Sequence, residues 1–185
     1  MSNNAELPKT FDQYPKAKLL WKGPAPIEYL DRLTATVNSH LKFYVKREDC
    51  NSGLAFGGNK LRKLEYVIGD ALAQGVDTLV TTGGVQSNHM RQTTAAANKH
   101  GLKTVLTPRD AVSNDSHEYR CLGNVQLNQI LGATVLPVGT TEEEAMEYVR
   151  KQGGKPYWIP SGASTHPLGG LGYARCKSSG SCQVS

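Results

Sequence analysis

The chain has 185 residues, a formal net charge of +5 and 38% hydrophobic residues, the composition of a globular protein large enough to bury a core. No run of about 18 apolar residues could span a bilayer, and the opening residues 1–8 lack the basic and apolar regions of a secretion signal, so the sequence predicts a cytoplasmic protein. The basic residues are scattered among acids, which gives little support to nucleic-acid binding.

The first part of the chain predicts an irregular arm. Four prolines interrupt residues 1 to about 50, where regular structure would otherwise form. The segment closes with the strand-like run Leu41–Lys46. We therefore expect an arm that ends in one strand.

From Leu61 onward, helical and strand-like segments alternate. Apolar residues recur at helical spacing from Leu61 to Leu72, and Gly75 closes that helix before the apolar strand Thr78–Thr82. Three similar units follow: helix Asn88–Lys99 with strand Lys103–Thr107, helix Ser116–Leu131 with strand Ala133–Val138, and a helix capped by Thr141 with strand Pro156–Ile159. This alternation predicts an α/β fold with a doubly wound, mostly parallel sheet.

A glycine loop places one lysine, Lys60, where the first of these helices begins. The amine of a lysine condenses with an aldehyde only when it is unprotonated. Burial, or the positive charge of Arg62 and Lys63, would lower the pKa of Lys60 toward that state. We expect Gly57 and Gly58 to give a flat ring room against the backbone. The loop thus predicts Lys60 as a covalent anchor.

A second glycine loop, Gly83–Gln92, lies between a strand and a helix. In a parallel sheet such a turn lies at the carboxyl end of the strand, where ligands bind, and the free N–H groups of the helix suit a carboxylate or phosphate. Ser87 and Asn88 add donors, and His89 could carry a proton or bind a carboxylate. The alternative is an ordinary turn in which Ser87 or Asn88 caps the helix.

Two segments resemble nucleotide-binding motifs and fail on inspection. Gly53–Lys60 has Asn59 where a Walker loop needs lysine, and Leu61 replaces the required Ser or Thr. Gly169–Ala174 lacks the full dinucleotide spacing and follows the last strand instead of the first. Both mismatches disfavour a Rossmann-type nucleotide binder.

The cysteines and the acidic run predict no metal site. Four cysteines show neither C-x-x-C spacing nor paired histidines, which disfavours zinc and a disulfide framework: Cys50, Cys121, Cys176 and Cys182. We expect reduced, mostly buried structural thiols. The acids between Glu142 and Glu147 read as the solvated face of one helix, with charge in its first turn.

Three long motifs, in order, closely resemble the 1-aminocyclopropane-1-carboxylate deaminase and D-cysteine desulfhydrase family. They are Lys46–Tyr66, Gly83–Asn88 and Ile159–Gly172. Enzymes of that family use pyridoxal phosphate on the tryptophan-synthase-β type of fold. The resemblance covers residues 15 to 175 approximately.

The resemblance implies a role for each site residue. Lys60 would be the internal Schiff-base lysine, which also moves protons during the reaction. Asn88 would hydrogen-bond the ring hydroxyl of pyridoxal 5'-phosphate, and Asn59 would brace the lysine loop. Ser87 would meet the small amino-acid substrate, as nucleophile or carboxylate donor, with Asn88 and His89 beside it. The family also implies a homodimer.

The substrate implied by the resemblance depends on the branch. Deaminases of the family typically carry glutamine where this chain has His89, so that position looks like the desulfhydrase branch, while the run Asp49–Phe56 looks like the deaminases. We expect D-cysteine or a related D-amino acid, giving sulfide, pyruvate and ammonia. 1-Aminocyclopropane-1-carboxylate is the alternative.

Family members are about twice as long as this chain, so the resemblance implies a truncated form with impaired activity. Residues 1–60 would be an arm of the large domain, 61–170 a small α/β domain and 174–185 an irregular tail. A non-catalytic fragment that associates with a full-length homologue is the alternative. In either case apolar arm residues would lose burial: Leu19, Leu20, Trp21, Ile27, Leu30 and Leu33.

Overall fold

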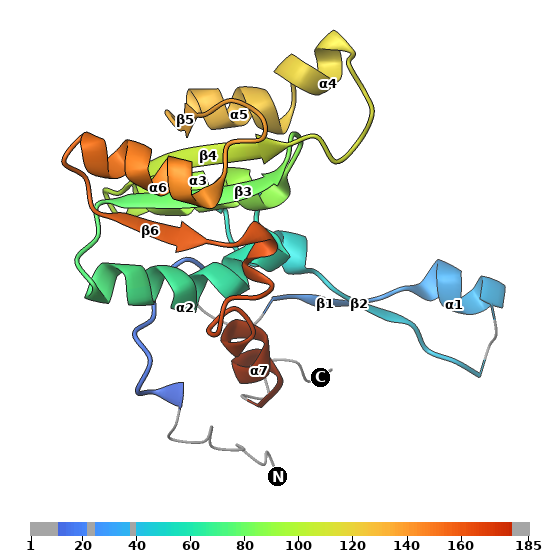
Figure 1. The fold of residues 1–185 in the computed structure, drawn as a ribbon. Helices are drawn as coiled ribbons and strands as arrows, with labels where there is room; N and C mark the ends of the chain where they lie inside the picture. The colour runs from blue at the N-terminus through green and yellow to red at the C-terminus, as the bar shows by residue number, and fades with distance from the viewer. Residues whose placement is uncertain (1–10, 22–24, 38–39, 179–185) are drawn as a thin grey trace.

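A four-stranded parallel sheet with helices on both faces forms the centre of the molecule (Figure 1). The structure, a computed structural model, describes residues 11–21, 25–37 and 40–178. The strand order is β5-β4-β3-β6, and the strands are β3 (Thr78–Gly84), β4 (Lys103–Arg109), β5 (Thr134–Val135) and β6 (Pro156–Ile159). Thr78 is in register with both Lys103 and Pro156, so the three longer strands start together. The doubly wound α/β fold is confirmed.

Both faces of this sheet are covered. Helix α6 (Glu142–Lys151) lies on one face, and α3 (Asn88–Lys99) lies on the other (Figure 1). Successive residues of β3 point to opposite faces: Leu79 joins a core built with α2 (Asn59–Ala73), whereas Val80 packs toward α6. Burial of each such side chain stabilises the fold by about 1.5–3 kcal/mol. The near-continuous apolar run in β3 follows from this double cover.

The helix α2 forms as its periodicity predicted. Its apolar side chains from Leu61 to Ala71 recur every three or four residues and are fully buried. The helix stops at Ala73, and Gly75 follows with φ of +63°, a conformation that glycine takes at little cost. The predicted stop at Gly75 is confirmed.

One predicted helix is wrong. The segment Ser116–Leu131 forms two helices, α4 (His117–Cys121) and α5 (Asn124–Ile130). Gly123, between them, has φ of 62° and ψ of −127°, a region open essentially to glycine alone. The periodicity continued across this break, so the spacing of apolar residues did not reveal it.

The predicted strand Ala133–Val138 shortens to the two residues of β5. Leu136 still donates its N–H to the carbonyl of Leu106, but Pro137 follows and has no N–H for the ladder. This strand is at the edge of the sheet, where an early stop leaves few groups unpaired.

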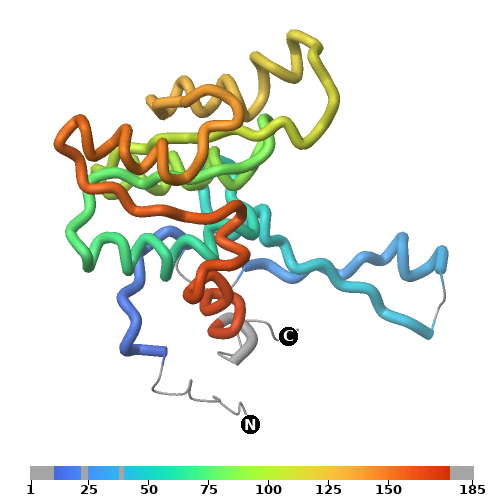
Figure 2. Tube along the Cα trace, viewed as in Figure 1, coloured from blue at the N-terminus to red at the C-terminus, as the bar shows by residue number. Residues whose placement is uncertain are grey.

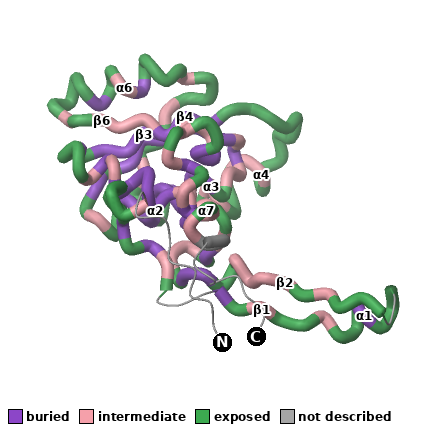
Figure 3. The backbone as a smooth tube through the Cα atoms, turned by 90° about the horizontal axis from the view of Figure 1, so that it is seen from below, coloured by how far each residue is buried: buried purple, intermediate pink, exposed green. Residues whose placement is uncertain are grey.

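The arm contains more structure than the single strand that was predicted. Strands β1 (Ile27–Tyr29) and β2 (Tyr44–Lys46) pair antiparallel and carry α1 (Asp31–Val37) at their far end. Figure 2 shows this hairpin projecting from the body, and Figure 3 shows that most of it is exposed.

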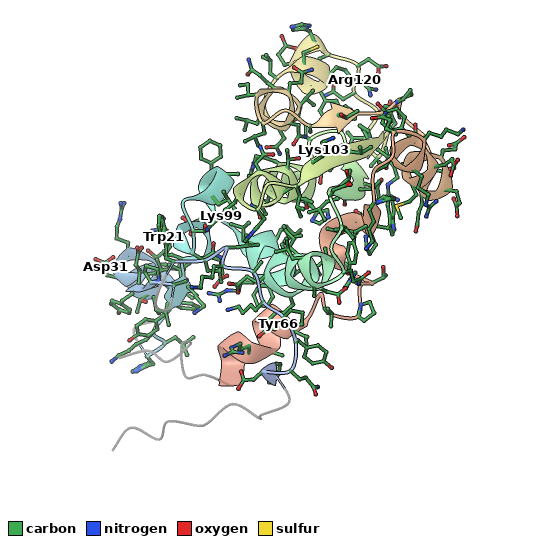
Figure 4. All side chains as sticks on the ribbon, turned by 90° about the vertical axis from the view of Figure 1, so that its left-hand side faces the viewer. Trp21, Asp31, Tyr66, Lys99, Lys103 and Arg120 are labelled. Carbon is green, nitrogen blue, oxygen red and sulfur yellow. The ribbon has the colours of Figure 1, made fainter. Side chains whose placement is uncertain are left out.

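The expected loss of burial in the arm is correct for some residues and wrong for others. Trp21, labelled in Figure 4, is 64% exposed and Leu33 is 44% exposed. Leu19 is 1% exposed because it packs into the core beside α2, with Leu20 against the same cluster. The chain just before residue 21 therefore belongs to the body. The proposed boundary at residue 60 stays a prediction.

The end of the chain corrects another expectation. Helix α7 (Leu171–Ser178) packs against α2 and continues into the segment that was predicted to be irregular. The rest of that predicted tail, residues 179–185, lies outside the described residues.

The described cysteines are free, yet they are not buried. Cys50 and Cys121 are both exposed thiols, contrary to the expected structural role, and the side chains of Cys176 and Cys182 lie outside the description. Across residues 11–21, 25–37 and 40–178, no group of histidine, cysteine and acidic side chains is arranged to hold a metal ion. In the same ranges, no helix combines the length and apolar character needed to cross a bilayer.

Candidate active site

The predicted site residues gather at the carboxyl edge of the sheet. Strand β3 ends at Gly84 and leads through Ser87 into α3, and β6 ends at Ile159 before the short helix η4 (Ser161–Ala163). The ammonium of Lys63, in the first turns of α2, donates to the carbonyl of Gly162 at 3.1 Å. The start of α2 is thereby held against the loop after β6, at the edge where open α/β sheets bind ligands (Figure 1).

Lys60 is in the first turn of α2 and is half-buried. Its Nζ donates to Oδ1 of Asn59 at 3.3 Å, and a Cβ built on Gly162 would lie 3.6 Å from its Cε. Burial lowers the pKa of the Lys60 amine, and the positive charge of Lys63 lowers it further. Arg62, the other cation expected to act, is instead paired with Glu48, with Nε 2.5 Å from Oε2.

The two glycines before Lys60 allow the chain to pack closely against itself. Gly57 and Gly58 adopt φ of 63° and 116°. A Cβ on Gly57 would lie 2.3 Å from the carbonyl oxygen of Asp49, and one on Gly58 would lie 2.8 Å from Nε2 of Gln92. The chain's own atoms occupy this space. The packing of the loop itself therefore requires both glycines, and the expected room for a flat ring stays a prediction.

Two side chains that the sequence analysis did not single out brace this loop. Asn51 donates to the Gly58 carbonyl at 3.2 Å and accepts from the Gly58 N–H at 3.1 Å. Gln92, 2% exposed on α3, donates to the Gly57 carbonyl at 2.5 Å. The brace expected of Asn59 is thus provided by Asn51 and Gln92, while the side chain of Asn59 lies against Lys60.

Ser87 is the N-cap of α3. Its Oγ accepts from the Met90 N–H at 3.3 Å, which stabilises the first turn of the helix. Gly83 makes the position possible, because a Cβ there would lie 2.5 Å from that oxygen. The cap uses a lone pair and leaves the hydroxyl hydrogen of Ser87 available to a ligand. The capping role and the ligand role are therefore compatible.

Asn88, the first residue of α3, is exposed, and its amide oxygen accepts two hydrogen bonds from the protein. Oδ1 accepts from Nη1 of Arg91 and from Nδ2 of Asn124, each at 2.9 Å. In the part of the chain that the structure describes, Nδ2 of Asn88 has no hydrogen-bond partner. Asn124 could not be found by sequence spacing, because it was expected inside one long helix.

His89, in the first turn of α3, is 3% exposed, and its ring lies against Thr81 of β3. The hydroxyl of Thr81 donates to the Ile159 carbonyl at 2.7 Å, so Nε2 of His89, 3.0 Å from the same hydroxyl oxygen, must carry the hydrogen. Nδ1 is then a buried acceptor with no partner among the described residues. Burial lowers the pKa of His89 to about 3, and Lys60 and Lys63 add to this.

Lys60, Lys63 and His89 lie close enough to interact, since the positive charges of both lysines lower the pKa of the imidazole. Ser87 and Asn88 adjoin His89 in sequence, at the start of the same helix. Gln92 links that helix to the lysine loop. An amine with a lowered pKa and the residues Ser87–His89, which we call the corner, therefore lie at one edge of the sheet.

Comparisons with known proteins give one consistent result. Residues 19–177 match the family described as pyridoxal-phosphate dependent enzyme. A curated relative named 1-aminocyclopropane-1-carboxylate deaminase, from Burkholderia ambifaria (strain MC40-6), is 54% identical over 171 residues, which cover 88% of this chain and 49% of the relative. A relative of the same name from Allorhizobium ampelinum is 52% identical, with 88% and 50% covered.

A solved structure agrees with these relatives. The structure titled as the crystal structure analysis of an ACC deaminase homologue superposes with a TM-score of 0.80 at 33% sequence identity. The match covers 100% of this chain and 55% of that one. The chain spans about half the length of the curated relatives it matches.

Proposed function

The chain belongs to the family of pyridoxal-phosphate dependent enzymes, and we propose that it carries the lysine-centred part of a site that deaminates a small amino acid. The proposal rests chiefly on Lys60. Its amine is half-buried, has a lowered pKa and is at the ligand-binding edge of a parallel sheet. The chain spans about half the length of its relatives, so deaminase activity is itself proposed for this chain.

The side chains of this edge fit the cofactor. Lys60 offers an amine that loses its proton more readily than an exposed lysine. Asn88 offers an amide N–H without a partner among the described residues. His89 keeps a buried acceptor that likewise has no partner there. When bound, pyridoxal phosphate supplies an electron sink for a carbanion next to the amino group of the substrate.

Each residue has a separate part in the proposal. Nζ of Lys60 would hold the cofactor at its aldehyde carbon and would move a proton at the substrate, with Oδ1 of Asn59 orienting the amine. Nδ2 of Asn88 would donate to the ring hydroxyl oxygen of the cofactor, because Oδ1 is already taken by Arg91 and Asn124. The Ser87 hydroxyl donates to the substrate carboxylate or attacks the substrate as a nucleophile.

The relatives' names support 1-aminocyclopropane-1-carboxylate as the first substrate to test. The opposing expectation, D-cysteine, rested on His89. That imidazole is buried and its Nε2 is bonded to Thr81, so the side chain is less available to a substrate than the sequence suggested. D-Cysteine, releasing sulfide, pyruvate and ammonia, remains the second candidate.

Covalent trapping tests the role of Lys60. The purified chain is incubated with pyridoxal phosphate, treated with borohydride to make any lysine–cofactor bond permanent, and analysed by peptide mass spectrometry. We expect the label on Lys60, and none on that peptide in Lys60→Ala. Lys99→Ala is the control, because Lys99 is exposed in the last turn of α3 (Figure 4). Equal labelling of the chain and Lys60→Ala would contradict the proposal.

Substrate choice is tested by ammonia release from 1-aminocyclopropane-1-carboxylate and from D-cysteine in parallel. We expect faster release from the former. Sulfide from D-cysteine as the main product would reverse the assignment and restore the desulfhydrase prediction. The Lys60→Ala variant should release ammonia from neither.

One feature favours the alternative of a chain that associates with a longer homologue. The projecting hairpin exposes several large apolar side chains, more than a solvated two-stranded ribbon needs: Tyr29, Leu33, Val37, Leu41 and Tyr44. Size-exclusion chromatography of the chain with the Burkholderia ambifaria relative tests this. Separate elution of the two would remove the alternative. The homodimer implied by the family is measured in the same experiment.

A further inference from the structure

We propose that Asn124 is a positioning residue that fixes the amide of Asn88 in one orientation, with its N–H groups toward the ligand. The inference rests on the proposed function, because the orientation of Asn88 has a consequence only if this amide meets the cofactor. Asn124 lies in α5 and is 36 positions from Asn88 in sequence. Its side-chain amide donates a hydrogen bond directly to the side chain of Asn88.

The orientation of each amide is dictated by a group that can only donate or only accept. The Arg91 guanidinium only donates, so the atoms of Asn88 and Asn124 that it contacts, at 2.9 Å and 2.5 Å, are both amide oxygens. The other end of the Asn124 amide is therefore Nδ2. It donates to Oδ1 of Asn88 at 2.9 Å and to the carbonyl of Gln86 at 2.8 Å.

Gln86 locks the same arrangement from the opposite side. Its Oε1 accepts from the Asn124 N–H at 2.9 Å. Its Nε2 donates to two main-chain carbonyls, those of Tyr119 at 2.6 Å and Leu122 at 2.9 Å. Carbonyl oxygens only accept, so the Gln86 amide has no second orientation that keeps these bonds. The corner and the start of α5 are thus joined by a network with one consistent assignment.

The break between α4 and α5 brings Asn124 to this place. Gly123 has φ of 62°, and a Cβ there would lie 2.8 Å from Oε1 of Gln86. The break between the two helices therefore places Asn124 within hydrogen-bonding distance of Gln86 and Asn88.

The consequence for a ligand is selective. Both lone pairs of Oδ1 in Asn88 are used by Arg91 and Asn124, so the side chain can offer only Nδ2 to the site. Turning the amide around would place Nδ2 against the Arg91 guanidinium, donor against donor. The corner is therefore built for a ligand oxygen that accepts, such as an ionised ring hydroxyl.

Asn124→Asp tests this inference. A carboxylate keeps the acceptor for Arg91, but it cannot donate to Oδ1 of Asn88 and repels that oxygen, so the amide of Asn88 is no longer held with Nδ2 toward the ligand. We expect pyridoxal phosphate to bind about tenfold more weakly, the loss of one hydrogen bond to a charged group. We also expect the absorbance maximum of the bound cofactor to shift, because the ring oxygen loses its donor. A residue with a merely structural role would not move that maximum.

Gln126→Glu, an exposed substitution of the same charge on α5, is the matched control and should bind and absorb as the unchanged chain does. If Asn124→Asp does not fold, as judged by circular dichroism, Asn124→Ala replaces it with the same readouts. Asn124 variants that bind and absorb like Gln126→Glu would overturn the inference. Failure of the unchanged chain to be labelled at Lys60 would instead refute the proposed function, and this inference with it.

Discussion

The two glycine loops at the carboxyl edge are built in opposite ways. In the lysine loop the backbone is strained, with positive φ at Ala55 and Phe56, yet the Lys60 amine makes one hydrogen bond to the described residues, at 3.3 Å. In the corner after β3 the side chains are tightly bonded: Ser87 caps α3 and Asn88 is fixed by two donors. The fold fixes the path of the first loop and the side chains of the second.

This difference suits the proposed roles. An amine that binds a cofactor, releases it to a substrate and then moves a proton needs freedom at its tip. A group that orients a ligand needs the reverse, because each degree of misalignment costs catalytic rate. Gln92 joins the two loops through the Gly57 carbonyl, so the backbone that carries Lys60 is held at a defined place.

Gly57→Ala should break the lysine loop and have the largest effect. Its φ is 63°, and the new Cβ would lie 2.3 Å from the Asp49 carbonyl oxygen, which is main chain and cannot move aside easily. Left-handed strain and overpacking each cost about 1–3 kcal/mol, so we expect the free energy of unfolding to fall by about 3 kcal/mol or more. Urea denaturation measures this loss.

Gly101→Ala is the matched control. Its φ is 71°, close to that of Gly57, but a Cβ there meets nothing within 4 Å. The cost should be the left-handed conformation alone, about 1–2 kcal/mol. Equal losses in the two variants would show that Gly57 is not packed against the Asp49 carbonyl.

Much of the fold could be predicted because its signals are local. The apolar spacing in α2, the glycines that follow α2 and α3, and the Thr141 cap of α6 each act within a few residues. The break at Gly123 is different, since it depends on Gln86, which is far away in sequence. The two-stranded arm is also non-local, because β1 is short and forms only by pairing with β2.

The sequence pointed to the residues proposed to meet a ligand, but not to the side chains that support them. Lys60, Ser87 and Asn88 were found because glycine loops mark the edge of a sheet. Gln92 and Asn124 were missed, because an amide in a helix gives no periodic signal and its partners, Gly57 and Asn88, come from other elements. The cofactor itself was implied by family resemblance and not by spacing.

The dependence of stability on pH tests whether His89 is buried in its neutral form. Its pKa is lowered to about 3 in the fold from an ordinary value near 6.5, so the unfolded chain binds the extra proton first. Its contribution to stability is complete above pH 6.5 and is lost as the pH falls toward 3. Over that window the free energy of unfolding should decrease by up to about 1.4 kcal/mol per pH unit.

Urea denaturation from pH 7 to pH 4 measures this slope. His89→Gln keeps an N–H donor for Thr81 and has no proton to gain, so its slope should be shallower. His117→Gln, on the exposed first turn of α4, controls for removing an imidazole from the chain. An unchanged slope in His89→Gln would mean that His89 is not buried in its neutral form.

The smallest effect separates the two roles of Ser87. Ser87→Ala and Thr141→Ala each remove an N-cap hydroxyl, and each should lower the free energy of unfolding by about 1 kcal/mol. Their effects on ligand binding should differ, because Thr141 caps α6 in a capping box of its own, whereas Ser87 is at the proposed site. Titration of the cofactor-loaded chain with 1-aminocyclopropane-1-carboxylate should show weaker binding for Ser87→Ala alone. If both variants bind this amino acid equally well, Ser87 is a cap and nothing more, and the corner then acts on a ligand through Asn88.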